Sequence, residues 1–418
     1  MFFPASFVPA GRFAAESFSC QSMVLHLVKT IHGAPWAMRQ IRELSRSGAD
    51  IAVALPSAQK GLASRYRDFG ARVVEADLDF TARRPWRLAH AVRRCRELIA
   101  EVQPDIIHSH FVSTTVTARL ALGRAHPVPR VFQVPGPLHL EHAAFRRLDL
   151  ATSGPLDYWI GSCRWTCDEY RRAGIPAERV FLSYYGSDVE TLRHGERGSF
   201  RRELGLSHDA PLVGLVAHIY APKRFLGQTR GLKGHEDFID AFRIVVERIP
   251  SARAVIVGGP WNGATAYEQR LRALGRASCG DRIMFTGHRT DIPAVYADLD
   301  VAVHPSLSEN CGGAVESLAA QVPTVATAVG GLPDVVVPDR TGWLVPPRSP
   351  RELAGAMLEA LANREEAARR ARAGRDLVRR LFDVRRTGAE VASIYRQILG
   401  AREFPAMAAE DARACTNG

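Results

Sequence analysis

The sequence predicts an α/β protein built from two doubly wound domains in tandem, and three observations support this. The chain has 418 residues, which exceeds what one hydrophobic core of ordinary size accommodates. Short apolar runs typical of buried parallel strands alternate with segments of helical periodicity. The alternation loosens between Gly136 and about Gly195 and then resumes, which indicates two separate βαβ series.

The first series begins at Met23, after an opening segment without clear periodicity. We expect a first domain over residues 23–195, preceded by a disordered N-terminal extension over residues 1–22. The expected strands are MVLHLV, IAVALP, ARVVEA, PDIIHSH and PRVFQVPG, and the expected helices include APWAMRQIRELSRSG, residues 82–102 and STTVTARLAL.

The second series begins at PLVGLVAHI, and we expect its domain over residues 196–385. Its expected strands continue with ARAVIVGG, RIMFTG, DVAVHPS, TVAT and WLVP, and its helices include EDFIDAFRIVVERI and EQRLRALG. A C-terminal helix over residues 386–402 is expected to pack back on the first domain. Residues 403–418 lack periodicity and are expected to form a flexible tail.

The chain carries 55 Lys and Arg against 44 acidic residues, so its formal net charge is +11 and anionic partners are favoured. Zinc knuckles, basic regions with heptads and aromatic-rich ribonucleoprotein strands are absent from the sequence, which argues against nucleic-acid recognition. Arginines concentrate in the amphipathic segment 82–102. That segment is compatible with a helix resting on an anionic membrane and with an ordinary solvated helix.

The seven scattered cysteines indicate reduced thiols in a cytoplasmic protein. Cys163 and Cys167 are four residues apart, but no second pair or histidine cluster completes a zinc site in the sequence, so no metal is expected. No apolar run reaches the ~18 residues of a membrane span. The opening lacks the basic start and continuous apolar stretch of a signal peptide, so we expect no secretion by that route.

The stretch HPSLSENCGGAVESLAAQ carries the strongest chemical signal. A strand ends there in a polar turn, and a helix of small residues is expected to begin near Gly312 and Gly313. Their amides and the helix dipole suit a diphosphate. Glu309 and Glu316 are repelled by phosphate and suit sugar hydroxyls instead. The sequence therefore predicts a site for a diphosphate joined to sugars.

This stretch resembles the donor-site signature of the retaining glycosyltransferases of family 4, which have the GT-B fold of two Rossmann-like domains facing a central cleft. The resemblance covers roughly residues 23–400. It implies that Glu316 binds the ribose of the donor nucleotide and that Glu309 contacts the donor sugar. The family places seven residues between these glutamates, and here there are six. Glu309 is alternatively a helix-start acid stabilised by the dipole.

The resemblance extends to a second motif, in which an arginine follows a strand and a Lys-Gly pair follows later. Lys233 and Gly234 match the pair, which implies that Lys233 binds the donor diphosphate. His218 stands where the family has arginine, and an insertion between these two positions carries further cations. The insertion is either a solvated loop or a segment that closes over the donor.

Three further positions follow from the resemblance. Backbone groups near Gly287, His288 and Arg289 are expected to pair with the nucleotide base. Gly33 is expected to approach the donor or acceptor from the first domain. A histidine of that domain is expected to face the donor sugar, and His139 is the candidate, although His108, His110 and His142 lie nearby in the sequence. A lone histidine is more often structural.

The resulting prediction is an enzyme that transfers a hexose from a UDP-, GDP- or ADP-sugar to an acceptor hydroxyl with retention, and that needs no cofactor or metal. Its expected catalytic residues are Lys233, Glu309 and His139. The acceptor is expected to be a sugar or lipid-linked saccharide of bacterial surface polysaccharide or glycolipid synthesis, at the inner face of the cytoplasmic membrane. The alternatives are a sugar-nucleotide epimerase of the same architecture and a catalytically silent nucleotide-sugar-binding protein.

Overall fold

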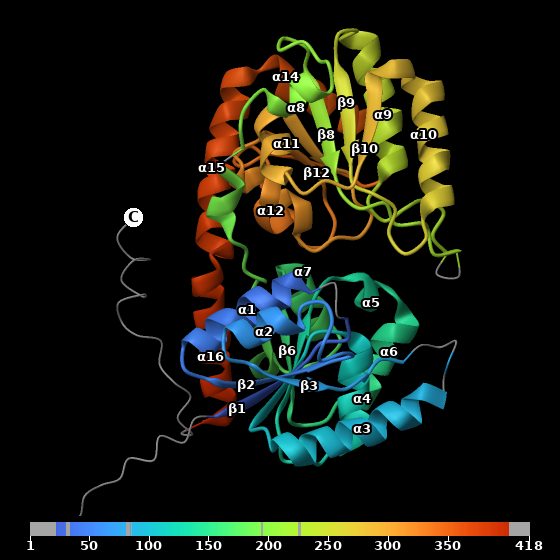
Figure 1. Ribbon diagram of the computed structural model, residues 1–418. Helices are drawn as coiled ribbons and strands as arrows, with labels where there is room; N and C mark the ends of the chain where they lie inside the picture. The colour runs from blue at the N-terminus through green and yellow to red at the C-terminus, as the bar shows by residue number, and fades with distance from the viewer. Residues whose placement is uncertain are drawn as a thin grey trace, which may run out of the picture.

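A computed structural model describes residues 22–30, 34–80, 84, 86–193, 195–224 and 227–400 of the chain. Two parallel β-sheets with helices on both faces form its core, as predicted (Figure 1). We call the part around the first sheet the first domain and the part around the second sheet the second domain. The predicted tail and nearly all of the N-terminal extension lie outside the described residues.

The first domain contains a seven-stranded sheet with the order β3-β2-β1-β4-β5-β6-β7. Its strands are β1 (Met23–Leu27), β2 (Asp50–Leu55), β3 (Arg72–Glu75), β4 (Ile106–Ser109), β5 (Arg130–Val134), β6 (Asp157–Gly161) and β7 (Val180–Leu182). Its helices are α1 (Pro35–Arg46), α2 (Ala63–Asp68), α3 (Trp86–Val102), α4 (Val112–Leu122), α5 (Leu138–Glu141), α6 (Ala143–Thr152) and α7 (Arg164–Arg172), with short 3₁₀ turns at Ala177–Arg179 and Val189–Arg193.

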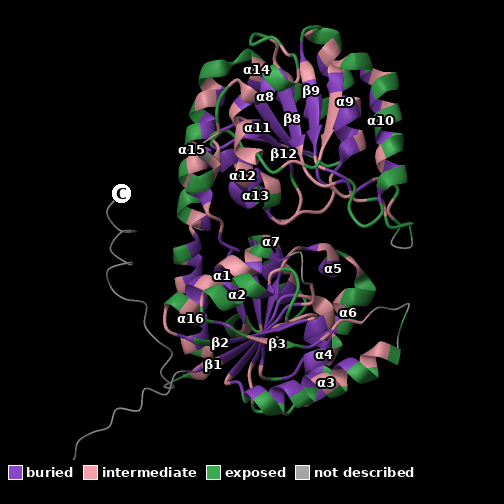
Figure 2. Ribbon diagram, viewed as in Figure 1, coloured by how far each residue is buried: buried purple, intermediate pink, exposed green. Residues whose placement is uncertain are grey.

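Strand β1 shows why these sequences form a doubly wound sheet. Successive side chains of a strand point to opposite faces. Val24 joins the core beneath α1, whereas Leu25 and Leu27 join the core beneath α3 and α4. Both faces are thus buried, which explains the continuous apolar run in the sequence (Figure 2).

The second domain contains a six-stranded sheet with the order β10-β9-β8-β11-β12-β13. Its strands are β8 (Leu212–Val216), β9 (Arg253–Val257), β10 (Ile283–Gly287), β11 (Val301–His304), β12 (Thr324–Thr327) and β13 (Trp343–Val345). Its helices are α8 (Ser199–Glu203), α9 (His235–Arg248), α10 (Thr265–Cys279), α11 (Ile292–Asp298), α12 (Gly312–Ala319), α13 (Leu332–Val335), α14 (Pro350–Ala362) and α15 (Arg364–Phe382), with a 3₁₀ turn at Gly280–Arg282.

The chain passes between the domains twice, and the two crossings are joined. The backbone N–H of Ser187 donates to the carbonyl of Phe382 at 2.8 Å. Directly after this point Asp383 caps the last helix, α16 (Val384–Leu399), by accepting from the amides of Arg385 and Arg386. Helix α16 packs on α1 of the first domain, so α15 and α16 run along one side of both domains (Figure 1).

Loops that follow strands of the two domains contact each other. The side-chain amide of Asn310 donates to Ser162 Oγ at 3.0 Å. A Cβ placed on Gly136 would lie 4.0 Å from Asn310 Cβ, and one on Gly330 would lie 3.0 Å from Pro137 Cγ. Ligands of doubly wound sheets bind beyond the carboxyl ends of the strands. The candidate site therefore lies where these loops meet.

None of the helices within the described ranges combines the length and apolar character that crossing a bilayer requires. The five cysteines in those ranges are free and buried.

Candidate active site

Lys233 and Glu309 form an ion pair at the carboxyl ends of β8 and β11, with Lys233 Nζ donating to Glu309 Oε2. Lys233 lies just before α9, and Gly234 between them has φ +67°. A Cβ at Gly234 would lie only 1.9 Å from the carbonyl oxygen of Pro305. Only glycine therefore allows the Lys233 loop to approach the loop that carries Glu309 this closely.

Two further groups donate hydrogen bonds to the Glu309 carboxylate. Ser306 Oγ donates to Oε2 at 3.2 Å, and the amide of Asn310 contacts Oε1 at 3.1 Å. Burial acts to raise the pKa of Glu309, but the charge and hydrogen bond of Lys233 outweigh burial and lower it. The neighbouring His304 has its pKa lowered to about 4 by burial and is neutral at pH 7. Glu309 is therefore a carboxylate and Lys233 an ammonium at neutral pH.

Helix α12 begins at Gly312, as predicted, and its first turn leaves the backbone accessible. A Cβ at Gly312 would lie 3.0 Å from Glu309 Oε1, and one at Gly313 would lie 3.0 Å from His304 Cε1. Neither position has room for a side chain, and Gly312 lies next to Glu309 and is exposed. Amides at a helix start next to an ammonium group are a suitable environment for a diphosphate.

Glu316 follows one turn later on α12 and interacts with both domains. Tyr296 OH donates to its Oε2 at 3.4 Å. Burial raises the pKa of Glu316, and the charges of Arg39 and Lys233 only partly oppose this. Arg39 belongs to α1 of the first domain, where its Nε donates to the carbonyl of Gly186 at 3.1 Å. Arg39 was not among the predicted site residues, because nothing in its local sequence links it to Glu316.

The loops after β8 and β10 carry the other predicted donor residues. Burial lowers the pKa of His218, and the charges of His288 and Lys233 lower it further. His218 is therefore neutral at pH 7 and offers a hydrogen bond, not a second cation. The Arg289 guanidinium is bound by Glu203 and Asp291 at 2.6–2.8 Å, so only its backbone is left for a base.

The inserted segment between His218 and Lys233 contains Arg230, whose guanidinium is already paired with carboxylates. Arg230 forms ion pairs with Asp237 and Asp240 of α9. Burial acts to lower its pKa, but the two carboxylates outweigh burial and raise it. Arg230 therefore stabilises the start of α9 in this structure.

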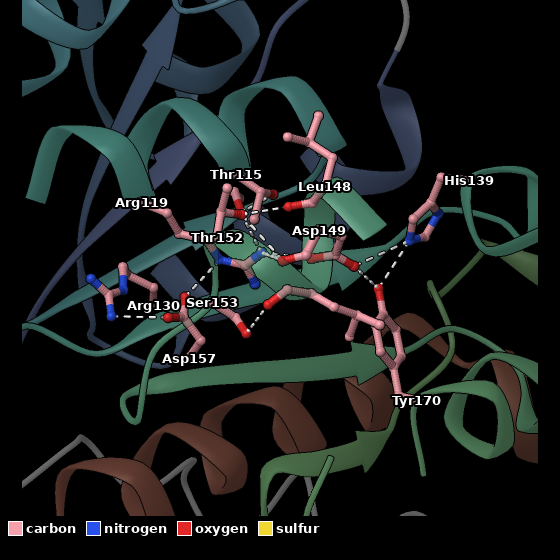
Figure 3. Close-up of polar contacts among 12 residues, drawn as sticks. Thr115, Arg119, Arg130, His139, Leu148, Asp149, Thr152, Ser153, Asp157 and Tyr170 are labelled. Carbon is pink, nitrogen blue, oxygen red and sulfur yellow. Dashed lines mark hydrogen bonds and ion pairs between the residues drawn. The ribbon is translucent and has the colours of Figure 1, made fainter. Parts of the chain in front are cut away.

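His139 lies in a buried polar network of the first domain (Figure 3). Tyr170 OH donates to Asp149 Oδ2 at 2.6 Å and lies 2.9 Å from His139 Nε2. The only hydroxyl proton of Tyr170 is used in its hydrogen bond to Asp149. In the second hydrogen bond His139 Nε2 must therefore be the donor and Tyr170 OH the acceptor. Nε2 is therefore unavailable as a base, and the catalytic role of His139 stays a prediction.

The network continues from Asp149 to a second carboxylate. Arg119 donates to Asp149 at 2.6 Å and to Asp157 at 2.8 Å, and Arg130 donates to Asp157 at 2.9 Å. The side chains of Arg119, Asp149 and Asp157 are at most 1% exposed. Each carboxylate of the network is thus paired with a guanidinium inside the first domain, whereas Arg119 Nη2 and Arg130 Nε have no hydrogen-bond partner within the described part of the chain.

The other histidines considered for the sugar contact are arranged differently. His108 and His110 are fully buried and contact the hydroxyls of Tyr395 and Tyr185, so they do not face a substrate. With His26 they form three stacked or tilted rings beneath α16. His142 contacts the ring of Phe145. Gly33 lies outside the described residues.

Comparisons with known proteins assign a family. Residues 36–191 match the model of Glycosyltransferase Family 4, and residues 224–363 match that of Glycosyl transferases group 1. The D-inositol 3-phosphate glycosyltransferase of Saccharomonospora viridis is 30% identical over 319 residues, 71% of each chain. That of Mycobacteroides abscessus is 33% identical over 193 residues, 44% of this chain. The matches span only 40% and 52% of the M. abscessus and Corynebacterium glutamicum relatives.

Solved structures share the fold across most of the chain. The Anabaena protein HepE, crystallised with UDP and glucose, has a TM-score of 0.72 at 21% identity, covering 89% of this chain and 98% of that chain. Sucrose-phosphate synthase from Thermosynechococcus elongatus has a TM-score of 0.73 at 19% identity, covering 91% and 100%. The predicted GT-B fold is thus confirmed, and the chain belongs to the family 4 glycosyltransferases.

Proposed function

We propose that this glycosyltransferase moves a hexose from a nucleoside diphosphate sugar to an acceptor hydroxyl with retention of anomeric configuration. The observation that carries the proposal is the Lys233–Glu309 ion pair beside the exposed backbone of Gly312 and Gly313. HepE is similar in fold and its crystals contain UDP or UDP-glucose, which supports a nucleotide-sugar donor. Retention is proposed from the resemblance of the donor-site motif to the retaining enzymes of family 4.

In this proposal Lys233 and the amides at the start of α12 bind the diphosphate. As the bond between the sugar and the phosphate breaks, negative charge grows on the leaving oxygen, and Lys233 offsets it. Glu309 then loses Lys233 as its partner and accepts hydrogen bonds from sugar hydroxyls. Glu316 accepts from the ribose hydroxyls. The leaving phosphate oxygen takes the proton of the acceptor hydroxyl as the new glycosidic bond forms.

Calorimetric titration with UDP-, GDP- and ADP-sugars tests the donor site, with wild type measured beside Glu316→Gln. We expect one donor to bind and the variant to lose most of its affinity, because an amide is a weaker hydrogen-bond acceptor than a carboxylate. If no donor binds to the wild type, the donor site is wrongly assigned. NMR of the anomeric proton of the product tests retention.

Lys233 and the helix start supply the positive charge that a metal would otherwise provide, so we expect transfer without a divalent cation. Turnover should be the same in EDTA and in added magnesium. Loss of turnover in EDTA, restored by magnesium, would contradict this.

We propose a sugar or lipid-linked saccharide of bacterial surface polysaccharide or glycolipid as acceptor, met at the inner face of the cytoplasmic membrane. The relatives named above point to D-inositol 3-phosphate as a further compound for an acceptor panel. Helix α4 packs on both α3 and α6, and the three helices carry exposed apolar side chains, namely Trp86, Leu120, Phe145 and Leu148. Arginines accompany them, and such a surface suits anionic lipid.

Co-sedimentation with liposomes tests this surface. We expect binding to vesicles that contain phosphatidylglycerol and little binding to phosphatidylcholine alone, with binding weakened in Phe145→Ser. Equal binding to both vesicle types would remove the support for a membrane contact.

Two outcomes of the turnover assay would favour the alternative functions. Consumption of the donor without any acceptor would favour the epimerase, and donor binding without turnover would favour a silent binding protein.

A further inference from the structure

Four aromatic rings meet beyond the carboxyl ends of three adjacent strands in the second domain. His218 and Tyr220 follow β8, Trp261 follows β9 and His288 follows β10. The ring centroid of His218 lies 4.9 Å from Trp261 and 5.9 Å from His288, and Tyr220 lies 6.2 Å from Trp261. These separations are those of interacting rings. We call these four residues the aromatic cluster.

The backbone beneath the cluster is firmly held. The amide of Ile219 donates to the carbonyl of Gly259 at 2.9 Å, and the amide of Trp261 donates back to the carbonyl of Ile219 at 2.9 Å. Gly258 in turn donates to Gly287 at 2.9 Å. The loops after β8, β9 and β10 therefore continue the pairing of their strands. The rings are mounted on this paired backbone.

Two residues of the cluster, Trp261 and His288, are exposed to solvent, and Trp261 carries the larger ring. Trp261 is 38% exposed, whereas the tryptophans at 159 and 343 are 0% and 5% exposed. Indole is costly to leave in water, and a partly exposed indole on a rigid frame is a common recognition surface for planar ligands. Trp261 belongs to neither of the two hydrophobic clusters that Ile256 and Val257 of β9 join.

The cluster adjoins the ion pair described above. Tyr220 interacts electrostatically with Lys233 and with Glu309, and His218 interacts with Lys233. If the phosphates of a ligand bind Lys233, the groups of the ligand next to those phosphates therefore lie near the aromatic cluster. The base is the aromatic part of a nucleoside diphosphate sugar.

We propose that the aromatic cluster, through Trp261, stacks on the nucleobase of the donor. This inference rests on the proposed function, because it places the base of the same donor. Stacking on a ring face differs from reading the base edge, for which the backbone of residues 287–289 is the candidate. Trp261 would thus supply affinity for the base, while the backbone supplies the choice between bases.

Calorimetry and tryptophan fluorescence with UDP and with inorganic pyrophosphate test the stacking. We expect UDP to quench the fluorescence of the wild type and Trp261→Ala to bind UDP about tenfold more weakly. Pyrophosphate affinity should be unchanged in Trp261→Ala, since it has no base. Trp261→Phe should keep most of the UDP affinity, because a ring face remains. Leu182→Ala removes an apolar side chain of the first domain that is 37% exposed, and it should bind UDP like the wild type.

Three results would overturn the inference, and they are distinguishable. Wild-type affinity for UDP in Trp261→Ala would show that the cluster does not contact the base. An affinity loss for UDP-glucose without a loss for UDP would assign the cluster to the sugar instead. Absence of UDP and pyrophosphate binding to the wild type would contradict the proposed function itself, and the inference would fall with it.

Discussion

The two domains each contain a cluster of buried charges, but the clusters differ in how completely they are enclosed. In the first domain Arg119, Asp149 and Asp157 are at most 1% exposed and hold one another in place. In the second domain the side chains of Lys233 and Glu309 are 22% and 13% exposed. The first cluster has no access for a ligand, whereas the second retains it.

We interpret this difference in exposure as a difference in role: the enclosed cluster stabilises the first domain, and the accessible ion pair is the candidate for ligand binding. Removing one partner of an enclosed charge pair leaves the other without compensation and destabilises the fold. Removing one partner of an accessible pair costs little stability, because water replaces it. The same residue types thus predict opposite consequences of mutation in the two domains. The predictions below test that contrast, beginning with the largest effect.

Asp149→Asn should destabilise the protein by about 3–5 kcal/mol, because it leaves the Arg119 guanidinium undercompensated in the core. The free energy of unfolding in urea measures this. Asp209→Asn is a suitable control, since its side chain is 98% exposed, and it should be neutral. A loss below about 1 kcal/mol in Asp149→Asn would show that the buried network is not a structural support.

Stability should fall as the pH drops below about 6.5. Burial lowers the pKa of His26, His108 and His110, the last to about 3, and burial lowers the pKa of His235 to about 3. These groups stay neutral in the folded state but take up protons when unfolded, so acid favours unfolding. Each histidine contributes about 1 kcal/mol between pH 7.5 and 5.5.

Urea unfolding at pH 7.5, 6.5 and 5.5 measures this slope. His208→Ala removes an exposed histidine and should leave the slope unchanged. A free energy of unfolding that does not vary over this range would mean that the buried histidines are accessible to protons in the folded state.

Arg39→Gln should weaken donor binding about fivefold, which corresponds to about 1 kcal/mol. The charge of Arg39 opposes the burial that raises the pKa of Glu316. Without that charge the pKa of Glu316 rises further, so donor binding should be lost at a higher pH on the acid side. Calorimetry between pH 5.5 and 8 measures both effects. Arg46→Gln, on the exposed end of the same helix, is the control, and an unchanged pH profile in Arg39→Gln would contradict the assignment.

Local sequence patterns predicted the elements and the start of α12, but not the contacts across the chain. Gly312 and Gly313 lie close to Glu309 in the sequence, so one short segment is enough to predict that they belong to the same donor site. Trp261 follows a different strand, and only the parallel sheet brings its ring to His218. Arg39 approaches Glu316 only because the domains are joined face to face.

His139 shows the opposite limit of sequence reasoning. Its position after a strand and a Pro-Gly-Pro turn is typical of a residue facing a substrate. The partners of its Nε2 are Asp149 on α6 and Tyr170 on α7, and the sequence near His139 does not predict these contacts. We expect His139→Gln to lower the melting temperature and to leave the donor affinity nearly unchanged.

The turnover and stability of Lys233→Ala, measured together, test the central claim most directly. The account predicts that kcat falls about 10²–10³-fold, as when one charge-stabilising group is removed from a transition state, while the free energy of unfolding changes by less than about 1 kcal/mol. Lys60→Ala, an exposed lysine of the first domain, should leave both unchanged. Wild-type turnover in Lys233→Ala would contradict the account, because the accessible ion pair would then be structural.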